Sequence, residues 1–243
     1  MAGFRRLGDG EPHQGRADAA VAPRRIDRKR AEQQDRARVG LAEHGRIDGL
    51  VNNAGGQFPS PLESISDKGW DAVVRNNLNG SFSMMREVFT QWMRAHGGAI
   101  VGVVAPVDFG FPNMGHTGAA RAGVINLTQT AALEWVQHGV RVNAVAPGSI
   151  IGSGLGTYSA EFQERLKTRR THIPYHRLGT EAEVSACICF LLSPASTYVT
   201  GLVLQVDGGL RLAKHNWTVP EHQAIPPYDP FGQSARPEFL KGQ

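Results

Sequence analysis

Amide and glycine residues follow the first strongly apolar run of the chain. Leu50 and Val51 end this run, and the sequence continues as Asn52-Asn53-Ala54-Gly55. A short buried run that breaks into Asn and Gly is typical of a parallel strand just before its crossover. In open α/β sheets, ligands bind outside the carboxyl ends of such strands. The chemistry predicted at this turn is therefore ligand binding.

The two cysteines do not suggest a metal site. Cys187 and Cys189 lie two residues apart within a helical pattern, so they face different sides of the helix. That spacing favours neither a disulfide nor a pair of metal ligands. We predict no metal, and we interpret the cysteines as small apolar helix residues that suit a reducing cytoplasm.

Strand patterns and helix patterns alternate along most of the chain. The apolar, β-branched run Ala99–Ala105 is short and bounded by Gly and Pro, as a buried parallel strand should be. Such alternation predicts βαβ units and a parallel sheet with helices on both faces, which is the doubly wound α/β class. The further expected strands are Val140–Ala146 and Leu202–Val206. The first expected helix is capped by Ser66 and interrupted at Asn76–Gly80. The later expected helices are Ser81–His96, Thr117–His138, Ala160–Arg170 and a helix that runs from the capping box at Thr180 to Leu192.

Composition divides the chain into three parts. Residues 1–38 have no readable period and are rich in charge, which favours a poorly packed or disordered segment. Residues 39–212 form the expected domain, and residues 213–243 are a Pro-rich tail.

Charge and hydrophobicity exclude two classes of partner. Residues 1–40 contain ten Lys and Arg and six Asp and Glu, a difference of +4. This difference equals the net charge of the whole chain, so the remaining residues have no net charge. No basic face is then left for the folded body, and we expect no nucleic acid partner. No apolar run approaches the ~20 residues of a membrane span, and no secretory signal follows Met1. We therefore expect a cytoplasmic protein.

Four motifs follow one another along the chain: Asn52-Asn53-Ala54-Gly55, Asn77-Leu78, the run from Arg141 to Gly148, and Val199-Thr200-Gly201 with Val206-Asp207-Gly208-Gly209. In this order and spacing they resemble the short-chain dehydrogenase/reductase family. Within that family, the stretch from His116 to Val124 and the segment Leu133-Glu134-Trp135 look most like peroxisomal trans-2-enoyl-CoA reductases and related bacterial citronellol or citronellal dehydrogenases.

The resemblance implies a Rossmann-type sheet and a nicotinamide cofactor, either NADP or NAD. It places Asn53, Ala54 and Gly55 along the adenosine ribose. It places Pro147, Gly148 and Ile150 beside the nicotinamide. It also implies that the side-chain amide of Asn77 stabilises a helix kink and binds a water. The resemblance also implies a homodimer or homotetramer in which the helices Ser81–His96 and Thr117–His138 pack against their symmetry mates.

The sequence departs from the family at its catalytic positions. The family uses a Tyr as general acid, four residues before a Lys. Alignment on Arg121-Ala122-Gly123-Val124 puts Arg121 at the Lys and Thr117 at the Tyr. Arg keeps the charge and can still bond a ribose hydroxyl, whereas Thr cannot act as an acid near neutral pH. We therefore name His116, which is adjacent and titratable, as the replacement acid. The alternative for His116 is a loop histidine bonded to backbone.

A second departure lies upstream of Asn52. The family holds the cofactor phosphates on a Gly-x-x-x-Gly-x-Gly turn at a helix N-terminus. Residues 1–48 contain no such turn. We therefore expect the N-terminal βαβ unit to be missing or degenerate, and residues 1–38 resemble a frame-shifted translation more than an evolved domain.

These features leave three functional hypotheses. The first is an NAD(P)-dependent oxidoreductase that reduces an enoyl-CoA-like thioester, because an enolate oxygen needs hydrogen-bond donors more than a strong acid. The second is an alcohol dehydrogenase of the citronellol or citronellal type, acting on a small-molecule substrate. The third is a non-catalytic remnant that serves as a dimerising or ligand-binding module.

Overall fold

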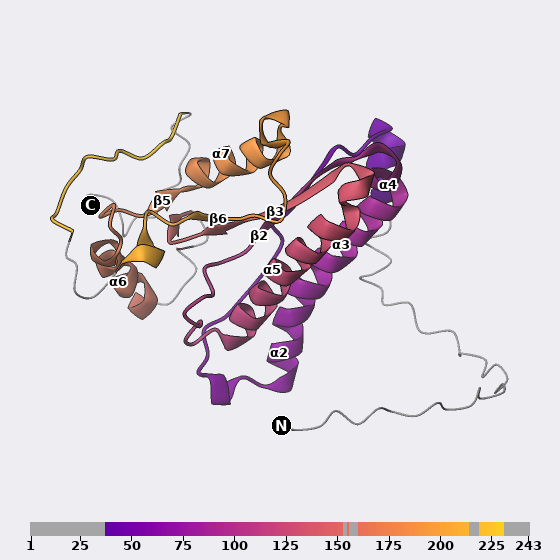
Figure 1. Cartoon of the computed structure of the whole chain (residues 1–243). Coiled ribbons are helices and arrows are strands. Elements are labelled where there is room, and N and C mark those ends of the chain that lie inside the picture. Colours follow the sequence, from indigo (N-terminus) through magenta and orange to yellow (C-terminus); the bar gives the residue numbers. More distant parts are fainter. Residues whose placement is uncertain (1–36, 153–154, 156–159, 214–218, 231–243) are drawn as a thin grey trace, which may run out of the picture.

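Four parallel strands form the centre of the protein. The computed structural model describes residues 37–152, 155, 160–213 and 219–230. The strands β1 (Gly49–Asn52), β2 (Gly98–Val103), β3 (Val140–Pro147) and β6 (Val203–Val206) lie in the order β1-β2-β3-β6, and each neighbouring pair is parallel (Figure 1). The parallel sheet predicted from the alternating pattern is confirmed.

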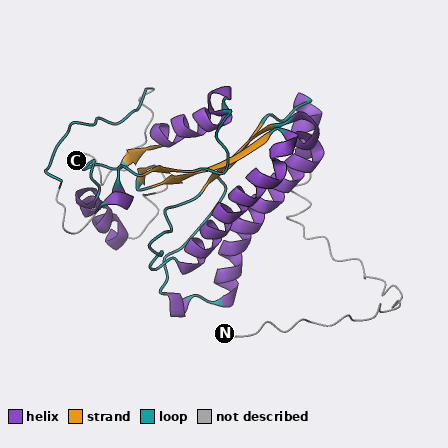
Figure 2. Cartoon of the chain, viewed as in Figure 1, coloured by secondary structure: helices purple, strands orange, loops and turns teal. Residues whose placement is uncertain are grey.

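Helices cover both faces of this sheet. Figure 2 shows the strands between α7 (Glu181–Leu192) on one side and a layer of long helices on the other. Leu191 of α7 packs on Val101 and Val145. On the opposite face, α5 (Gly115–Trp135) and the helix before it bury the rest of the sheet in two clusters. Members of these clusters include Met85, Phe89, Ile100, Val124, Ala131, Val142 and Ala144.

The helical run after β1 is continuous, which corrects our expectation of a break at Asn76–Gly80. The run begins at Asp67, where Ser66 accepts a hydrogen bond from the Gly69 N–H, and ends at His96. A wider, π-helical turn accommodates the polar insertion, so the helix does not have to end there. The run consists of α2 (Asp67–Val74), a π turn (Arg75–Asn79), α3 (Gly80–Val88), a second π turn (Phe89–Met93) and α4 (Arg94–His96).

The helix that carries the aligned catalytic positions starts earlier than expected. α5 begins at Gly115, and a 3-10 turn, Val136–His138, continues it. His116 is therefore a helical residue of the first turn, which corrects the loop position of its alternative interpretation. The backbone bond of that interpretation is present, because Nδ1 accepts from the Thr117 N–H. The small residues of α5 let it pack closely, since a Cβ on Gly123 would lie 3.0 Å from Leu78.

A smaller layer closes the carboxyl end of the sheet. The strands β4 (Ile150–Ile151) and β5 (Gly179–Thr180) pair in parallel beside α6 (Ala160–Arg169). The capping box predicted at the start of α7 is confirmed, because Thr180 and Glu183 bond reciprocally. Residues 219–230, which we call the strap, run over this layer without helix or strand.

Several sequence expectations fall at the edges of the described residues. Residues 37–44 are helical, and Ala37 is buried beside Met85, so ordered packing begins before the expected boundary at residue 39. The rest of the segment 1–38 lies outside the described residues. Within them, β1 pairs with β2 alone, and no helix is long and apolar enough to cross a membrane.

Candidate functional site

The carboxyl ends of three strands meet at one edge of the sheet. Gly55 and Gly56 follow β1, Val103 ends β2, and Pro147 ends β3. Asn52, at the end of β1, is buried, and its Nδ2 donates to the Ser81 carbonyl over 3.3 Å. The residues after it are exposed, so the turn predicted to bind a ligand is accessible there. These exposed residues are Asn53, Ala54 and Gly55.

Asn77 presents an unpartnered acceptor at this edge. Its side chain is 1% exposed, and its Nδ2 donates to the carbonyls of Gly56 (2.8 Å) and Val73 (2.9 Å). Because both bonds use the amide nitrogen, they fix the orientation of the group. The Oδ1 atom is buried without a partner among the described residues, 2.6 Å from where a Cβ on Gly55 would lie. A ligand donor would satisfy this oxygen.

Arg121 places a fixed cation beside that oxygen. Its Nη1 donates to the Val103 carbonyl over 2.5 Å, and its Nη2 contacts the position of a Cβ on Gly55. Burial lowers the pKa of the guanidinium, and no carboxylate pairs with it in the described part of the chain. Arg121 and Asn77 thus leave a donor and an acceptor side by side above a glycine.

His116 and Thr117 occupy the first turn of the same helix. His116 is fully buried, and its Nδ1 accepts a hydrogen bond from the Thr117 backbone N–H over 2.8 Å. In the neutral ring the proton is therefore on Nε2, which has no partner among the described residues. The ring of Phe58 packs edge-on against it at 4.5 Å between centroids. Thr117 lies one helical turn before Arg121, so the two aligned positions share a face of α5.

The turn after β3 is anchored on both sides. The Gly148 N–H donates to the Val206 carbonyl (3.0 Å), and a Cβ on Gly148 would lie 2.8 Å from the Asp207 backbone. Ile150 pairs with Gly179 in the small sheet. Since only glycine fits at position 148, the turn Pro147–Ile150 has one backbone path past the strand ends.

The comparisons with known proteins decide the family. A family model described as enoyl-(acyl carrier protein) reductase matches residues 11–211. The chain belongs to the short-chain dehydrogenase/reductase family.

Relatives of this family differ in their named substrates. A peroxisomal 2,4-dienoyl-CoA reductase of Pongo abelii is 38% identical over 178 residues, which cover 72% of this chain and 61% of that protein. The chain therefore spans about three fifths of that relative. The solved structure of the citronellol catabolism dehydrogenase AtuB of Pseudomonas aeruginosa PAO1 is 48% identical, with a TM-score of 0.65, over 75% of this chain and 70% of that one. An NADPH-bound ElxO variant is 28% identical, with a TM-score of 0.70, over 75% of each chain.

The structure of this short-chain dehydrogenase/reductase brings together some predicted residues and leaves others apart. Gly55, Asn77 and Arg121 meet at one point. In the described residues, no hydrogen bond joins His116 to Asn77 or Arg121. Sequence reasoning missed the Val103 carbonyl that anchors Arg121, because a backbone acceptor 18 residues away leaves no sequence signal.

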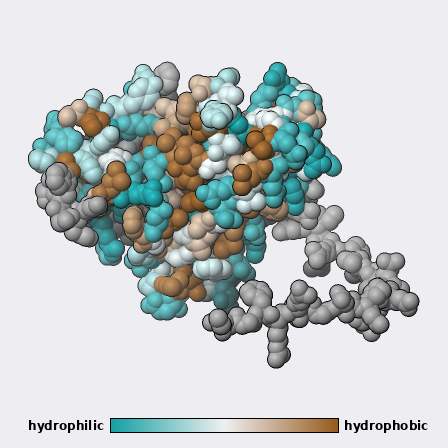
Figure 3. Space-filling view, viewed as in Figure 1, coloured by the Kyte–Doolittle hydropathy of each residue, from teal (hydrophilic) through white to brown (hydrophobic). Residues whose placement is uncertain are grey.

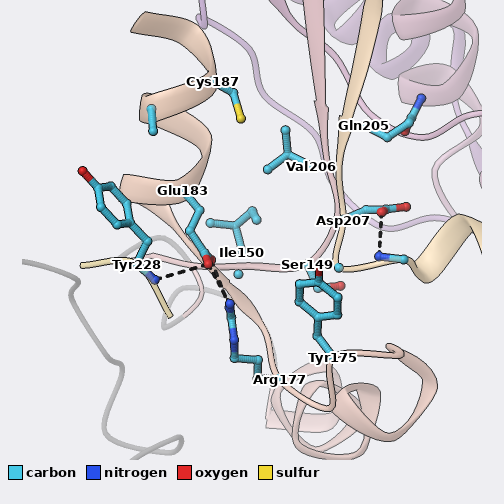
Figure 4. A pocket seen from close by; sticks show the side chains of 14 residues that line it. Ser149, Ile150, Tyr175, Arg177, Glu183, Cys187, Gln205, Val206, Asp207 and Tyr228 are labelled. Carbon is cyan, nitrogen blue, oxygen red and sulfur yellow. Dashed lines mark hydrogen bonds and ion pairs between the residues drawn. The ribbon is translucent and has the colours of Figure 1, made fainter. Parts of the chain in front are cut away.

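A cavity lies beside the turn after β3, and Ser149 and Ile150 of that turn line it. This cavity of about 410 Å³ lies between α7, the strap and the end of β6, and Figure 4 shows Arg177 and Glu183 on its wall. Burial alone would raise the pKa of Glu183, but hydrogen bonds from Arg177 and from two backbone N–H groups outweigh it and hold that pKa below its usual value. Burial, and then the charge of Glu183, raise the pKa of Cys187. The described residues contain no cluster of His, Cys, Asp or Glu that could hold a metal.

Proposed function

We propose that this chain is an NAD(P)-dependent oxidoreductase that reduces the carbon–carbon double bond of an enoyl-CoA-like thioester. The observation that carries the proposal is the guanidinium of Arg121, held by Val103 and aimed past Gly55. In such a reduction negative charge develops on the thioester oxygen. Fixed donors that face this charge are the main requirement of the step.

The residues around Gly55 fit a nicotinamide cofactor. The buried Oδ1 of Asn77 lacks a partner in the described residues, and a side chain at position 55 would fill the space in front of it. We infer that Asn53, Ala54 and Gly55 lie along the adenosine ribose, and that Arg121 donates to a ribose hydroxyl. When bound, the cofactor supplies the hydride. The NADPH-bound ElxO variant supports NADP or NAD without choosing between them.

The turn after β3 would hold the reactive end of the same cofactor. Pro147, Gly148 and Ile150 follow the strand end, and the turn has no freedom to move away because Gly148 abuts Asp207. We assign these three residues to the border of the nicotinamide ring. A rigid border would restrain the nicotinamide ring and so fix which face of that ring is turned toward the substrate.

Proton supply is assigned to the first turn of α5. The hydroxyl of Thr117 is 1% exposed and lies 3.3 Å from Nδ1 of His116. Since a Thr hydroxyl does not ionise near neutral pH, we assign Thr117 a hydrogen-bonding role and give His116 the transferable proton. Asn77 keeps the helix turn and a bound water in place. This set suits protonation of an enolate, which needs only a weak acid.

Oxidation of a citronellol-type alcohol is the second candidate. The 48% identity to AtuB favours it. Alcohol oxidation needs a base that removes the hydroxyl proton, and His116 is then that base. Both candidates need the bond from Arg121 to the ribose. They differ at the substrate, because an alkoxide requires a nearby base whereas a thioester enolate also requires the Arg121 cation.

Hydride transfer distinguishes these candidates. The purified chain is assayed with a medium-chain trans-2-enoyl-CoA and reduced cofactor, and separately with citronellol and oxidised cofactor, both at millimolar cofactor. We expect enoyl reduction that falls about two orders of magnitude in Arg121→Met. Arg46→Met, an exposed arginine paired with Asp48, is the matched control and should keep full activity. Activity with citronellol alone favours the second candidate, and no hydride transfer with either favours a ligand-binding module.

We also propose that the protein assembles as a homodimer or homotetramer through the layer of α3 and α5. These helices expose apolar side chains that the sheet does not cover, including Phe82 at 45% and Leu133 at 78% exposure. In the space-filling view, hydrophobic atoms gather in the middle of the face and at its lower end, where α2 and α5 begin (Figure 3). Exposed apolar area of this kind is typical of subunit interfaces.

A further inference from the structure

A cavity of about 360 Å³ lies between α6 and two loops at the carboxyl end of the sheet. One wall is apolar and rigid, because proline dominates it. The other wall is α6, from which Arg165 and Arg169, four residues apart, face the same side. The residues lining it are Pro59, Ser60, Pro61, Pro112, Asn113, Met114, Glu161, Arg165, Leu166 and Arg169.

The walls of this cavity are built by segments that adjoin the candidate site in the chain. The Ser60 N–H donates to the Asn113 carbonyl over 2.8 Å, which ties the two loops together. One loop continues from Gly55 and Gly56, and the other leads into His116. The opposite wall is tied to the β3 turn, since Nε of Arg169 donates to the Ser149 hydroxyl over 2.6 Å. Both walls of the cavity are thus tied to segments that flank the strand ends.

Arg169 has unused donors at the rim of the cavity. Only its Nε is bonded within the described residues, which leaves both Nη groups available. Arg165 forms an ion pair with Glu161, but both side chains are largely exposed, and such pairs are weak. Two guanidinium groups beside an apolar wall fit a ligand that has an apolar arm and an anionic group. A terpenoid alcohol has no anion and would leave both arginines unused.

We propose that Arg169, with Arg165 beside it, binds the phosphate groups of the CoA moiety of a thioester substrate. This inference rests on the proposed enoyl thioester reduction, because it identifies how the same site would recognise its substrate. Guanidinium binds phosphate through paired, charge-assisted hydrogen bonds. The apolar arm of the ligand cannot form such bonds. Arg169 also acts as a positioning residue, since its bond to Ser149 connects the phosphate site to the turn that borders the nicotinamide.

Binding without turnover tests this assignment. Calorimetry measures decanoyl-CoA and decanoyl-pantetheine, which lacks the phosphates, on the full chain in the absence of cofactor. We expect the CoA ester to bind at least tenfold more tightly. In Arg169→Gln the CoA ester should weaken about tenfold while the pantetheine ester is unchanged, and Arg165→Gln should act in the same direction with a smaller loss. Arg169→Lys keeps the charge but not the paired donors, so it should weaken the CoA ester less than Arg169→Gln does and leave the pantetheine ester unchanged, which keeps the test valid should the glutamine variant fail to fold.

Lys167 offers a matched control on the same helix. Its ammonium pairs with Glu164 and does not line the cavity, so Lys167→Gln removes one positive charge and should leave both affinities unchanged. Equal affinity for the two esters, or an equal loss in Lys167→Gln and Arg169→Gln, would overturn the assignment. Arginine-dependent CoA binding without hydride transfer would reject the proposed reaction and retain the phosphate site. Enoyl reduction whose KM for the CoA thioester is the same in the wild type and in Arg169→Gln would retain the proposed reaction and reject the phosphate site.

Discussion

The guanidinium of Arg121 and the buried amide oxygen of Asn77 both lie within 2.6 Å of the position that a Cβ on Gly55 would occupy. Three elements supply these groups: the loop after β1, the π turn of the following helix, and the middle of α5. Because position 55 has no side chain, both groups can lie close to the backbone of the loop after β1.

A side chain at position 55 should lower the stability of the protein and disturb the candidate site. A Cβ at position 55 would lie 2.6 Å from Oδ1 of Asn77 and would contact Nη2 of Arg121. We expect Gly55→Ala to lower the free energy of unfolding by about 1–3 kcal/mol, as overpacking does. Chemical denaturation measures the change. Gly40→Ala, with no atom within 4 Å of its Cβ, is the control and should not destabilise, so equal stability of the two variants would contradict this geometry.

Cofactor affinity should be low for this chain. Residues 1–48 contain no Gly-x-x-x-Gly-x-Gly turn, and pyrophosphate contacts at such a turn supply much of a dinucleotide's affinity. Losing two or three charge-assisted hydrogen bonds, at about 1.5–3 kcal/mol each, weakens binding on the order of a thousandfold. We expect millimolar dissociation constants for NADH and NADPH by calorimetry. A micromolar constant would show that other residues of the chain supply the phosphate site.

Assembly should depend on the exposed side of α5. Ala122 is exposed on this helix, one turn after Gly118. We expect Ala122→Glu to shift a dimer or tetramer toward monomer in light scattering, because a charge would then be buried in the apolar interface. Ala42→Glu, exposed in the helical residues 37–44, should leave the assembly unchanged. A wild-type monomer at high micromolar concentration would refute the interface.

The ion pair between Arg177 and Glu183 should make stability sensitive to acid. The pKa of Glu183 is lowered in the folded chain, so its contribution is complete above the unfolded value of about 4.3 and is lost as the pH falls through the lower folded value. We expect Glu183→Gln to be less stable at neutral pH and to lose less stability on acidification. Chemical denaturation of both proteins at neutral pH and at acidic pH provides the test. Glu161→Gln, an exposed pair, should retain the wild-type pH dependence.

Local signals explain which parts of the fold the sequence could predict. The capping box at Thr180 and the β-branched run of β2 depend on neighbouring residues, and the structure confirms both. The π turn at Asn77 was missed because its stability depends on the Gly56 carbonyl, 21 residues away. A polar run without that partner is typical of a helix end, which is what we expected.

The candidate site was predictable to a similar degree. Family motifs singled out Gly55, Asn77 and Arg121 one by one, with separate expected roles, and the structure places the three side by side. Alignment could not reveal that Arg121 is held by a backbone carbonyl or that Arg169 bonds Ser149. The four-residue spacing of Arg165 and Arg169 was the available signal, but it is shared by many solvated helix faces.

The strap has a consequence for how the molecule opens. Arg177 donates to the carbonyls of Ile225 and Pro226 as well as to Glu183, and the Thr180 hydroxyl donates to Tyr228. These bonds are made to the small layer near α6 and not to the central sheet. Because proteins open in contiguous cooperative units, the strap and that layer should exchange their amide hydrogens together, at a lower free energy than the strands.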